Sequence, residues 1–561
     1  MAADTSTPHR RRLARTCTFI ALAAVAFVLI VSWRWGAFAI GGSDSHCYAG
    51  QARMFAEGRL ELPPPVAVPV PWPNGAATFA PSGFAPGPAD SSVPLCAAGL
   101  SLLMTVALTL GGNAAIFVVV PLMGALTVWS TFVLGRRLVS VAVGAASAWL
   151  VACSPIFLYQ AVQPMSDVPA AALWTACLAV ALGVTKSRNA DPDAALESDE
   201  VHQTDSASRG PDSTWRRTDS AWRGPDSTWR RTSVLRVLAG LLAGAAITMR
   251  PNLAPLAVFP VLLALPSRRA VVATVGGIVP GVAVVAFLQA AIYGSPLRSG
   301  YGDLGQLFSV SHVAANLINY PAWLSLAHSP VLALGLLAPL VVRRRAAAWI
   351  LLSFVLTVVA AYLPYVPFAD WWYSRFLLPG LPALVVMMVA VLARTARRIP
   401  APLDAAALAL LTVAICGFWL TRANDLAVFR VKALEQKYVE LGRLVSTRLP
   451  SQAIVLAAQP SGSVRYYARL PTLSWDAIDP AWLDRVLDEC RSRGLVPYVA
   501  IESWETDAFR SRFKDQSAIA SLDWPPRAIL GSVISVYDPA DRARYLAGEQ
   551  IPTERITWKR R

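Results

Sequence analysis

Long apolar segments separated by short polar stretches occupy the first three quarters of the chain. Twelve of them approach the roughly 20 residues that a helix needs to cross a bilayer. They lie at 17–39, 94–111, 114–135, 139–160, 168–185, 234–249, 251–266, 270–292, 322–342, 346–366, 376–393 and 402–420. The pattern predicts a polytopic α-helical membrane protein whose membrane domain covers residues 17–420.

The basic connectors decide which of these segments cross. With the N-terminus inside, twelve spans would put connectors such as 343–345 and 394–398 outside, against the positive-inside rule. The weakest span is 94–111, "PLCAAGLSLLMTVALTLG", which follows a Pro-rich stretch. We read it as a helix at the outer interface. This leaves about eleven spans in the membrane of the cell (the plasma or inner membrane), with a cytoplasmic basic tail at 1–16, a first outer loop at 40–113 and a cytoplasmic linker at 186–233.

The linker contains a tandem repeat. Residues 205–232 read "DSASRGP DSTWRRT DSAWRGP DSTWRRT", four seven-residue units without an apolar seam. A coiled coil is excluded because it needs such a seam. Two interpretations stay open, a ligand-binding repeat and a recently duplicated linker, and the polar composition favours the linker.

From residue 421 onward the pattern changes to that of a small α/β domain. An amphipathic helical pattern over 424–450 is followed by β-rich runs near 453–459, 497–502 and 529–538, with a helical stretch at 480–494. Alternation of this kind predicts an α/β unit. With the N-terminus inside, an odd number of spans ends on the opposite side of the membrane. This parity argument places the domain, residues 421–561, outside the cytoplasm.

The amino-acid composition agrees with a membrane protein, and the distribution of its charges argues against a nucleic-acid partner. Hydrophobic residues make up 55% of the 561 residues, charged residues 15%, and the net charge is +15. Many basic residues lie between apolar segments, a pattern that encodes orientation, so nucleic acid is not expected as a partner. The seven cysteines include no CxxC pair, and a bridge between Cys47 and Cys96 is left open if both lie outside.

Two carboxylates are the candidates for acid–base chemistry. Asp44 follows the first span in "AIGGSDSHCYAGQARMFAEGRLEL", and Asp167 begins the span near 168. The same parity argument puts both on the outer face, where paired carboxylates can divide acid, base and metal-binding roles. The alternative for each is a helix cap or interfacial anchor.

Two arginines are the candidates for binding an anion. Arg250 and Arg375 each lie at the outer end of a span, where the orientation rule disfavours positive charge. A guanidinium there calls for an anionic partner, and it can hold two phosphate oxygens at once. The alternative is snorkelling to lipid headgroups.

Further polar residues on the same face are candidate substrate contacts. His46 and Tyr48 follow Asp44 closely in the first outer loop. Arg298, Tyr301 and Asp303 lie in the glycine-rich loop "YGSPLRSGYGDLGQLF", which either closes over a substrate or only connects two spans.

These features together resemble a known family. The order of "SDSHCYAGQARMFAEGRL", "PLCAAGLSLLMTVAL", "SPIFLYQAVQPMSDVPAA" and "YSRFLLPGLPAL" is similar to the polyprenyl-phosphate-dependent glycosyltransferases of the C-type fold. Within that fold it looks most like the branch of protein O-mannosyltransferases and lipid A aminoarabinose transferases. The likeness is clearest over 40–185, weaker through 420, and does not cover the C-terminal domain. The family usually has an Asp-Glu pair after the first span, whereas Asp44 here is followed by Ser45.

The resemblance implies inverting sugar transfer from a polyprenyl-phosphate donor in the bilayer to an extracytoplasmic acceptor, which would be an envelope glycan, lipid or protein. Asp44 would then be the general base, Arg375 and Arg250 would stabilise the departing phosphate, and Asp167 would orient the acceptor or help to hold a divalent metal ion. Because Asp44 lacks the acidic neighbour that the family usually has, whether a metal ion takes part stays open. Two other classes also stay open: a lipid-linked substrate transporter or flippase, and a non-catalytic envelope assembly protein.

Overall fold

The structure is a computed structural model that describes residues 8–66, 69–186, 226–302, 305, 307–400 and 403–557. The centre of the predicted repeat linker, 187–225, lies outside the described residues, as does Asp303.

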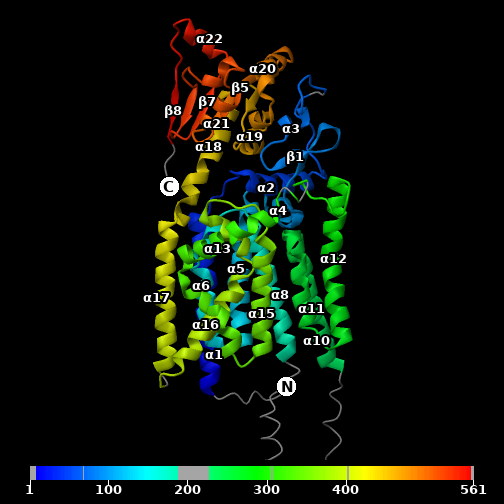
Figure 1. The fold of residues 1–561 in the computed structure, drawn as a ribbon, viewed down its shortest axis with the longest axis vertical. Helices are drawn as coiled ribbons and strands as arrows, with labels where there is room; N and C mark the ends of the chain where they lie inside the picture. The colour runs from blue at the N-terminus through cyan, green and yellow to red at the C-terminus, as the bar shows by residue number, and fades with distance from the viewer. Residues whose placement is uncertain are drawn as a thin grey trace, which may run out of the picture.

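A bundle of apolar helices forms the larger part of the molecule (Figure 1). In the described residues, seven helices are long and apolar enough to cross a membrane, which makes this a multi-pass membrane protein. They run over Arg11–Trp35 in α1, Ala115–Leu138 in η2 and α5, Asp167–Val184 in α8, Thr232–Met249 in α10, Arg268–Tyr293 (α12), Arg345–Tyr362 (α15) and Leu403–Asp425 (α17). Three further pairs of helices are each bent at a short break, and each pair counts as at most one more span. The first is α6 (Val141–Ala152) with α7 (Pro155–Ala161), and the third is η7 (Trp371–Leu377) with α16 (Leu381–Ala396). The second joins η5 (Val310–His312) and α13 (Val313–His328) to η6 (Pro330–Leu337) and α14 (Ala338–Val341).

The described chain thus offers up to ten spans by this criterion, where the sequence predicts about eleven. The difference lies at Pro251–Leu262, a short apolar stretch made of η3 (Pro251–Ala257) and α11 (Val258–Leu262). Pro255 within η3 and Pro260 within α11 each lack a backbone donor, and Pro251 begins the 3₁₀ helix η3, so no long regular helix forms in this stretch. The stretch still packs inside the bundle, where α11 contacts α8 and α12.

Two helices cap one end of this bundle. α2 (Ser43–Ala56) lies across the end, and α4 (Ala98–Gly111) packs against it (Figure 1). The 14 residues of α4 span about 21 Å, less than the hydrocarbon core of a bilayer. A helix of this length agrees with the prediction that 94–111 does not cross.

The C-terminal region carries a six-stranded mixed sheet beyond that end of the bundle (Figure 1). The strand order is β4-β3-β5-β7-β6-β8; β4, β3 and β5 are parallel, β7 is antiparallel to β5 and β6, and β8 is parallel to β6. The strands are β3 (Ala453–Leu456), β4 (Thr472–Leu473), β5 (Val496–Glu502), β6 (Ala528–Leu530), β7 (Ile534–Tyr537) and β8 (Glu554–Ile556). The helices are α18 (Val431–Arg448), α19 (Ser461–Ala468), α20 (Leu483–Ser492), α21 (Thr506–Phe513) and α22 (Asp541–Leu546), with 3₁₀ turns η8 (Val428–Arg430), η9 (Trp475–Ala477), η10 (Pro480–Trp482) and η11 (Ala518–Ser521).

The 40–113 segment is packed onto this sheet. It holds α3 (Gly75–Phe79), β1 (Phe84–Pro86), η1 (Pro88–Asp90) and β2 (Ser92–Pro94), with β1 antiparallel to β2. Trp72 and Phe79 are buried in one apolar core with Ile454, Leu473 and Trp475 of the C-terminal region. Because this core is shared, the segment and the sheet form one wall above the helical bundle.

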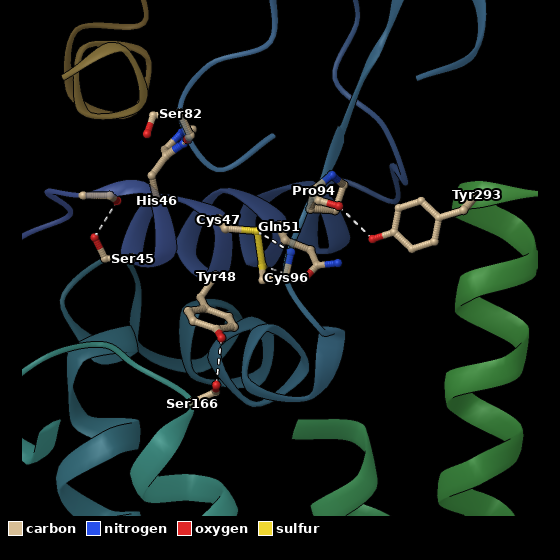
Figure 2. The surroundings of a disulfide bond; sticks show 11 residues. Ser45, His46, Cys47, Tyr48, Gln51, Ser82, Pro94, Cys96, Ser166 and Tyr293 are labelled. Atoms are coloured by element: carbon tan, nitrogen blue, oxygen red, sulfur yellow. Dashed lines mark hydrogen bonds between the residues drawn. A yellow bond between two sulfur atoms is a disulfide. The ribbon is translucent and has the colours of Figure 1, made fainter. Parts of the chain in front are cut away.

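A disulfide fixes the 40–113 segment internally. Cys47 in α2 is bonded to Cys96, just after β2, with a Cα–Cα distance of 6.0 Å (Figure 2). The backbone N–H of Cys96 also donates to Cys47 Sγ at 3.0 Å. The bridge that the cysteine pattern leaves open is therefore present, and it holds α2 beside the start of α4.

Candidate functional site

Four charged side chains from separate segments meet where α2 crosses the end of the bundle. Asp44 comes from the first turn of α2, Asp167 from the start of α8, Arg250 from the residue between α10 and η3, and Arg375 from η7. Arg375 Nη2 lies 2.8 Å from Asp44 Oδ2, and Arg375 Nη1 lies 4.0 Å from Asp167 Oδ2. Arg250 Nη2 lies 2.5 Å from Asp167 Oδ1. The charges thus alternate in a continuous chain, Asp44–Arg375–Asp167–Arg250, which we call the charge chain.

Burial differs along the charge chain. The side chain of Asp167 is 1% exposed and those of Arg250 and Arg375 are 13% exposed, whereas Asp44 is 36% exposed. The Nε atoms of both arginines and Oδ2 of Asp167 are buried without a hydrogen-bond partner. Buried ionic groups with unfilled hydrogen-bonding capacity are costly to keep. Such a cost is typical of a site built to receive another group.

Aromatic rings support both guanidinium groups. The Arg250 and Arg375 guanidinium carbons lie 5.5 and 5.2 Å from the centre of the Phe376 ring. Phe376 stacks on Tyr362 with ring centres 5.1 Å apart, and the Tyr362 hydroxyl accepts a hydrogen bond from Arg250 Nη1 at 2.8 Å. Cation–π contacts and the Tyr362 hydrogen bond hold the guanidinium groups in place, so the two arginines present a preformed cationic surface.

The charge chain borders a cavity of about 940 Å³. Asp44, Arg250 and Arg375 line it, together with Tyr48 and Tyr301. Asp167 is not among its lining residues and acts on the cavity only through the two arginines that it binds. Much of the remaining lining is apolar and aromatic, and a volume of this size is in the range of small-molecule sites.

The two carboxylates are engaged with arginines. The N-cap residue of α2 is Gly42, and no side chain makes a cap hydrogen bond there, although Asp44 lies in the first turn of the helix. The carboxylate of Asp44 instead accepts from Arg375, and that of Asp167 accepts from Arg250. The helix-cap alternative for Asp44 therefore has no hydrogen bond to support it in the described structure.

Tyr48 and His46 point to opposite sides of α2 (Figure 2). Tyr48 points into the bundle, where its hydroxyl is 2.7 Å from Ser166 Oγ, next to Asp167. His46 points toward the C-terminal region, where its Nδ1 is 2.7 Å from the carbonyl oxygen of Ser82. Burial lowers the pKa of His46 to about 4. His46 is thus a neutral packing residue away from the cavity and not a contact to its contents.

The glycine-rich loop is only partly at the site. Tyr301 lines the cavity and is 42% exposed. Arg298 is exposed and is not among the lining residues. Asp303 lies outside the described residues.

Several residues of the site carry no signal in the sequence that reveals them. Tyr362 and Phe376 read as ordinary aromatic residues of apolar segments, although Phe376 directly follows Arg375. Glu435 and Gln459 also line the cavity and come from the C-terminal region. Only the docking of that region on the bundle brings them there.

The residues do not fit a divalent metal site. Asp44 and Asp167 are each paired with a guanidinium, which occupies the place that a cation would take. A hard cation such as Mg²⁺ is usually held by carboxylates free of competing side-chain cations. The described part of the chain gathers no group of three or more His, Cys, Asp or Glu side chains suited to a metal ion. We derive no step through a metal.

Glu435 adds a titratable group to the cavity wall. Burial raises the pKa of Glu435 to about 7 from its ordinary 4.5, with Glu502 raising it further and Lys437 lowering it. The folded protein therefore holds this proton more tightly than the unfolded chain does. By linkage, the stabilisation of the folded state that comes from the protonated Glu435 is fully present below pH 4.5 and is lost as the pH rises through 7.

We expect Glu435→Gln to remove this pH dependence. Thermal unfolding of both proteins in detergent should be compared from pH 5 to pH 8. The midpoint of the variant should rise relative to that of the parent as the pH increases, because the parent must then bury a charge. A difference between the two midpoints that stays constant over this range would show that Glu435 does not titrate there.

Comparison with known proteins rests on structure. No protein-family model and no curated protein matches the chain. ArnT from Cupriavidus metallidurans, in a crystal structure bound to undecaprenyl phosphate, matches with a TM-score of 0.51 and 13% identity over 87% of this chain and 94% of that chain. The oligosaccharyltransferase of Archaeoglobus fulgidus, in its apo form, matches with a TM-score of 0.52 and 10% identity over 92% and 74% of the two chains.

These likenesses extend through the bundle and into the C-terminal region, since they cover most of this chain. At 10% and 13% sequence identity, these likenesses show a shared fold and nothing more specific. The chain has the C-type glycosyltransferase fold that its sequence resemblance implies.

Proposed function

We propose that the protein is a membrane glycosyltransferase, which transfers a sugar from a polyprenyl-phosphate donor to an extracytoplasmic acceptor with inversion at the anomeric carbon. One observation carries this proposal: a partly exposed carboxylate and two guanidinium groups supported by an aromatic ring line one cavity at the end of an apolar bundle. The ArnT structure bound to undecaprenyl phosphate, which shares the fold, supports the choice of donor.

The proposed reaction assigns a role to each member of the charge chain. The acceptor oxygen forms a bond to the anomeric carbon while its proton passes to the Asp44 carboxylate. The bond between the anomeric carbon and the phosphate oxygen breaks, and the electron pair leaves with the phosphate. Arg375 and Arg250 stabilise that charge. Asp167 holds both arginines and is a positioning residue.

The position of the charges also weighs against a transporter. Charged residues of transporters lie near the middle of the membrane on broken helices. Here Asp44 lies in the first turn of α2, which crosses one end of the bundle (Figure 1), so the charge chain is at that end and not at the middle, although a bent pair carries Arg375. A non-catalytic assembly protein would have no use for two guanidinium groups and a carboxylate gathered at a large cavity. The deciding experiment is incorporation of labelled sugar from a polyprenyl-phosphate donor by the purified protein.

Replacing Arg375 by Lys should weaken donor binding. Lysine keeps the charge but loses the planar fork that can hold two phosphate oxygens. Hydrogen bonds to charged groups contribute about 1.5–3 kcal/mol, so the affinity for undecaprenyl phosphate should fall about tenfold to a hundredfold. Arg397→Lys, at an exposed position after α16, is the matched control. Normal binding by Arg375→Ala would mean that this side chain has no part in the phosphate site.

The proposed reaction requires the sheet-bearing end of the bundle to face outside. A cysteine placed at the exposed Asp479 should react with an impermeant reagent in intact cells, and one placed at the exposed Arg397 should not. The five free cysteines that the structure describes are replaced first, and the Cys47–Cys96 bridge is kept. The reverse labelling pattern would place the cavity on the cytoplasmic face and contradict the proposed topology.

A further inference from the structure

A second cavity, of about 400 Å³, lies beside the first. One of its walls comes from residues 77–86 and the other from residues 458–508 of the C-terminal region. Gln459 lines both cavities, and its Nε2 packs against Gly42, two residues before Asp44. The two cavities therefore adjoin at Gln459, close to the proposed base.

The walls of this second cavity are held together by hydrogen bonds. Ser474 donates its backbone N–H to the Thr78 carbonyl oxygen at 2.7 Å and its hydroxyl to the Ala80 carbonyl oxygen at 2.9 Å. The backbone N–H of Ser82 donates to Ser461 Oγ at 2.9 Å. Because hydrogen bonds hold the two walls together, the cavity is preformed, and a ligand that binds there would not have to pay the entropy of ordering the walls.

Tryptophan and carboxylate side chains give this cavity its chemistry. Trp504 is 66% exposed, and its indole N–H donates to Glu502 Oε2 at 3.0 Å, which fixes the ring. Trp475 is 5% exposed, and its indole N–H has no hydrogen-bond partner. Asp476 is exposed at the wall, whereas the Glu505 carboxylate already accepts backbone N–H groups. An exposed indole face, that of Trp504, and an exposed carboxylate acceptor, that of Asp476, thus lie together at this cavity.

This chemistry suits a neutral polyhydroxylated ligand. The C–H face of a sugar ring packs on an aromatic face, while its hydroxyls donate to carboxylates and accept from N–H groups. The described lining contains no Lys or Arg, so an anionic ligand would meet only like charge. A peptide adding to the sheet would need a free strand edge. The backbone N–H of Ser474, just after the edge strand β4, is already used by Thr78.

We propose that the second cavity binds the neutral glycan part of the acceptor and leads it past Gln459 toward Asp44. This inference rests on the proposed glycosyl transfer and adds a substrate class to it: an acceptor that carries uncharged sugar units. Trp504 supplies the packing surface, and the Asp476 carboxylate accepts hydrogen bonds from the sugar hydroxyls and so orients the ring.

The test uses the purified full-length protein in nanodiscs on an array of neutral oligosaccharides, anionic oligosaccharides and Ser/Thr-rich peptides. The parent should bind one or more neutral oligosaccharides. Trp504→Ala should weaken that binding about tenfold or more, because it removes the stacking face. Trp504→Phe, which keeps a flat ring, should restore much of it. Tyr545→Ala is the control, since Tyr545 is an exposed aromatic residue of α22, at the far end of the C-terminal region (Figure 1).

Three results would overturn the inference: no binding of neutral oligosaccharides that depends on Trp504, binding confined to anionic oligosaccharides, or Trp504-dependent binding of the peptides alone. Undecaprenyl phosphate binding, measured on the same preparations, should be unchanged in Trp504→Ala. Failure of the proposed function would appear separately, as undecaprenyl phosphate binding that is absent or does not depend on Arg375. The two failures are therefore distinguishable.

Discussion

Asp44→Asn is expected to fold normally and to lose about a hundredfold to ten-thousandfold of its sugar-transfer rate. Asparagine is nearly the same size and can still accept a hydrogen bond from Arg375, as Asp44 does at 2.8 Å. It cannot take up the proton of an acceptor hydroxyl. Transfer of labelled sugar should be measured with the purified variant, together with its thermal unfolding.

Asp370→Asn is the matched control for this experiment. Asp370 precedes η7, the 3₁₀ helix that carries Arg375, but it makes no side-chain cap and is not among the cavity-lining residues. Its replacement should leave the transfer rate near that of the parent. If Asp44→Asn also transfers sugar at close to the parent rate, Asp44 is structural, and Asp167 or the cavity-lining Glu435 must be tested as the base.

Asp167→Ala is expected to destabilise the protein by about 3–5 kcal/mol, because it leaves the Arg250 guanidinium buried without its counter-charge. The side chain of Asp167 is 1% exposed, so water cannot replace it easily. Chemical unfolding in detergent measures the loss. Asp425→Ala breaks the exposed pair with Arg422 and should cost less than about 1 kcal/mol.

A double variant separates stability from function at the same pair. Asp167→Leu with Arg250→Met replaces a buried ion pair by apolar groups, which commonly recovers stability. We expect it to unfold close to the parent but to bind undecaprenyl phosphate poorly, since one guanidinium is lost and Arg375 loses a partner 4.0 Å away. Undiminished binding by this folded variant would show that the pair serves the fold alone.

The spans, the amphipathic helix now seen as α18 and the runs that contain β3 and β5 are all visible in the sequence. Each depends on a local periodicity of apolar residues, which burial imposes on any helix or strand. The same periodicity could have separated the candidates on α2. Residues i and i+4 share a helix face, as Asp44 and Tyr48 do, whereas His46 falls between them on the other side.

The bent pairs are harder to foresee. The apolar pattern predicts continuous spans at 322–342 and 376–393, yet the helices that contain them bend by 109° and 88°. A bend depends on what packs beside the break, and hydropathy averages over it. The segment η7, on one side of the second bend, carries Arg375 into the charge chain.

Hydropathy along the chain is enough to show a membrane protein and to place its charged residues at the ends of the spans, because burying charge and unpaired backbone in lipid is costly wherever it occurs. How these charges pair follows from the packing of distant segments. Asp44 and Arg375 are 331 residues apart, and Gln459 reaches the cavity from the C-terminal region. Such contacts depend on how elements pack across the whole chain, and no local pattern records that packing.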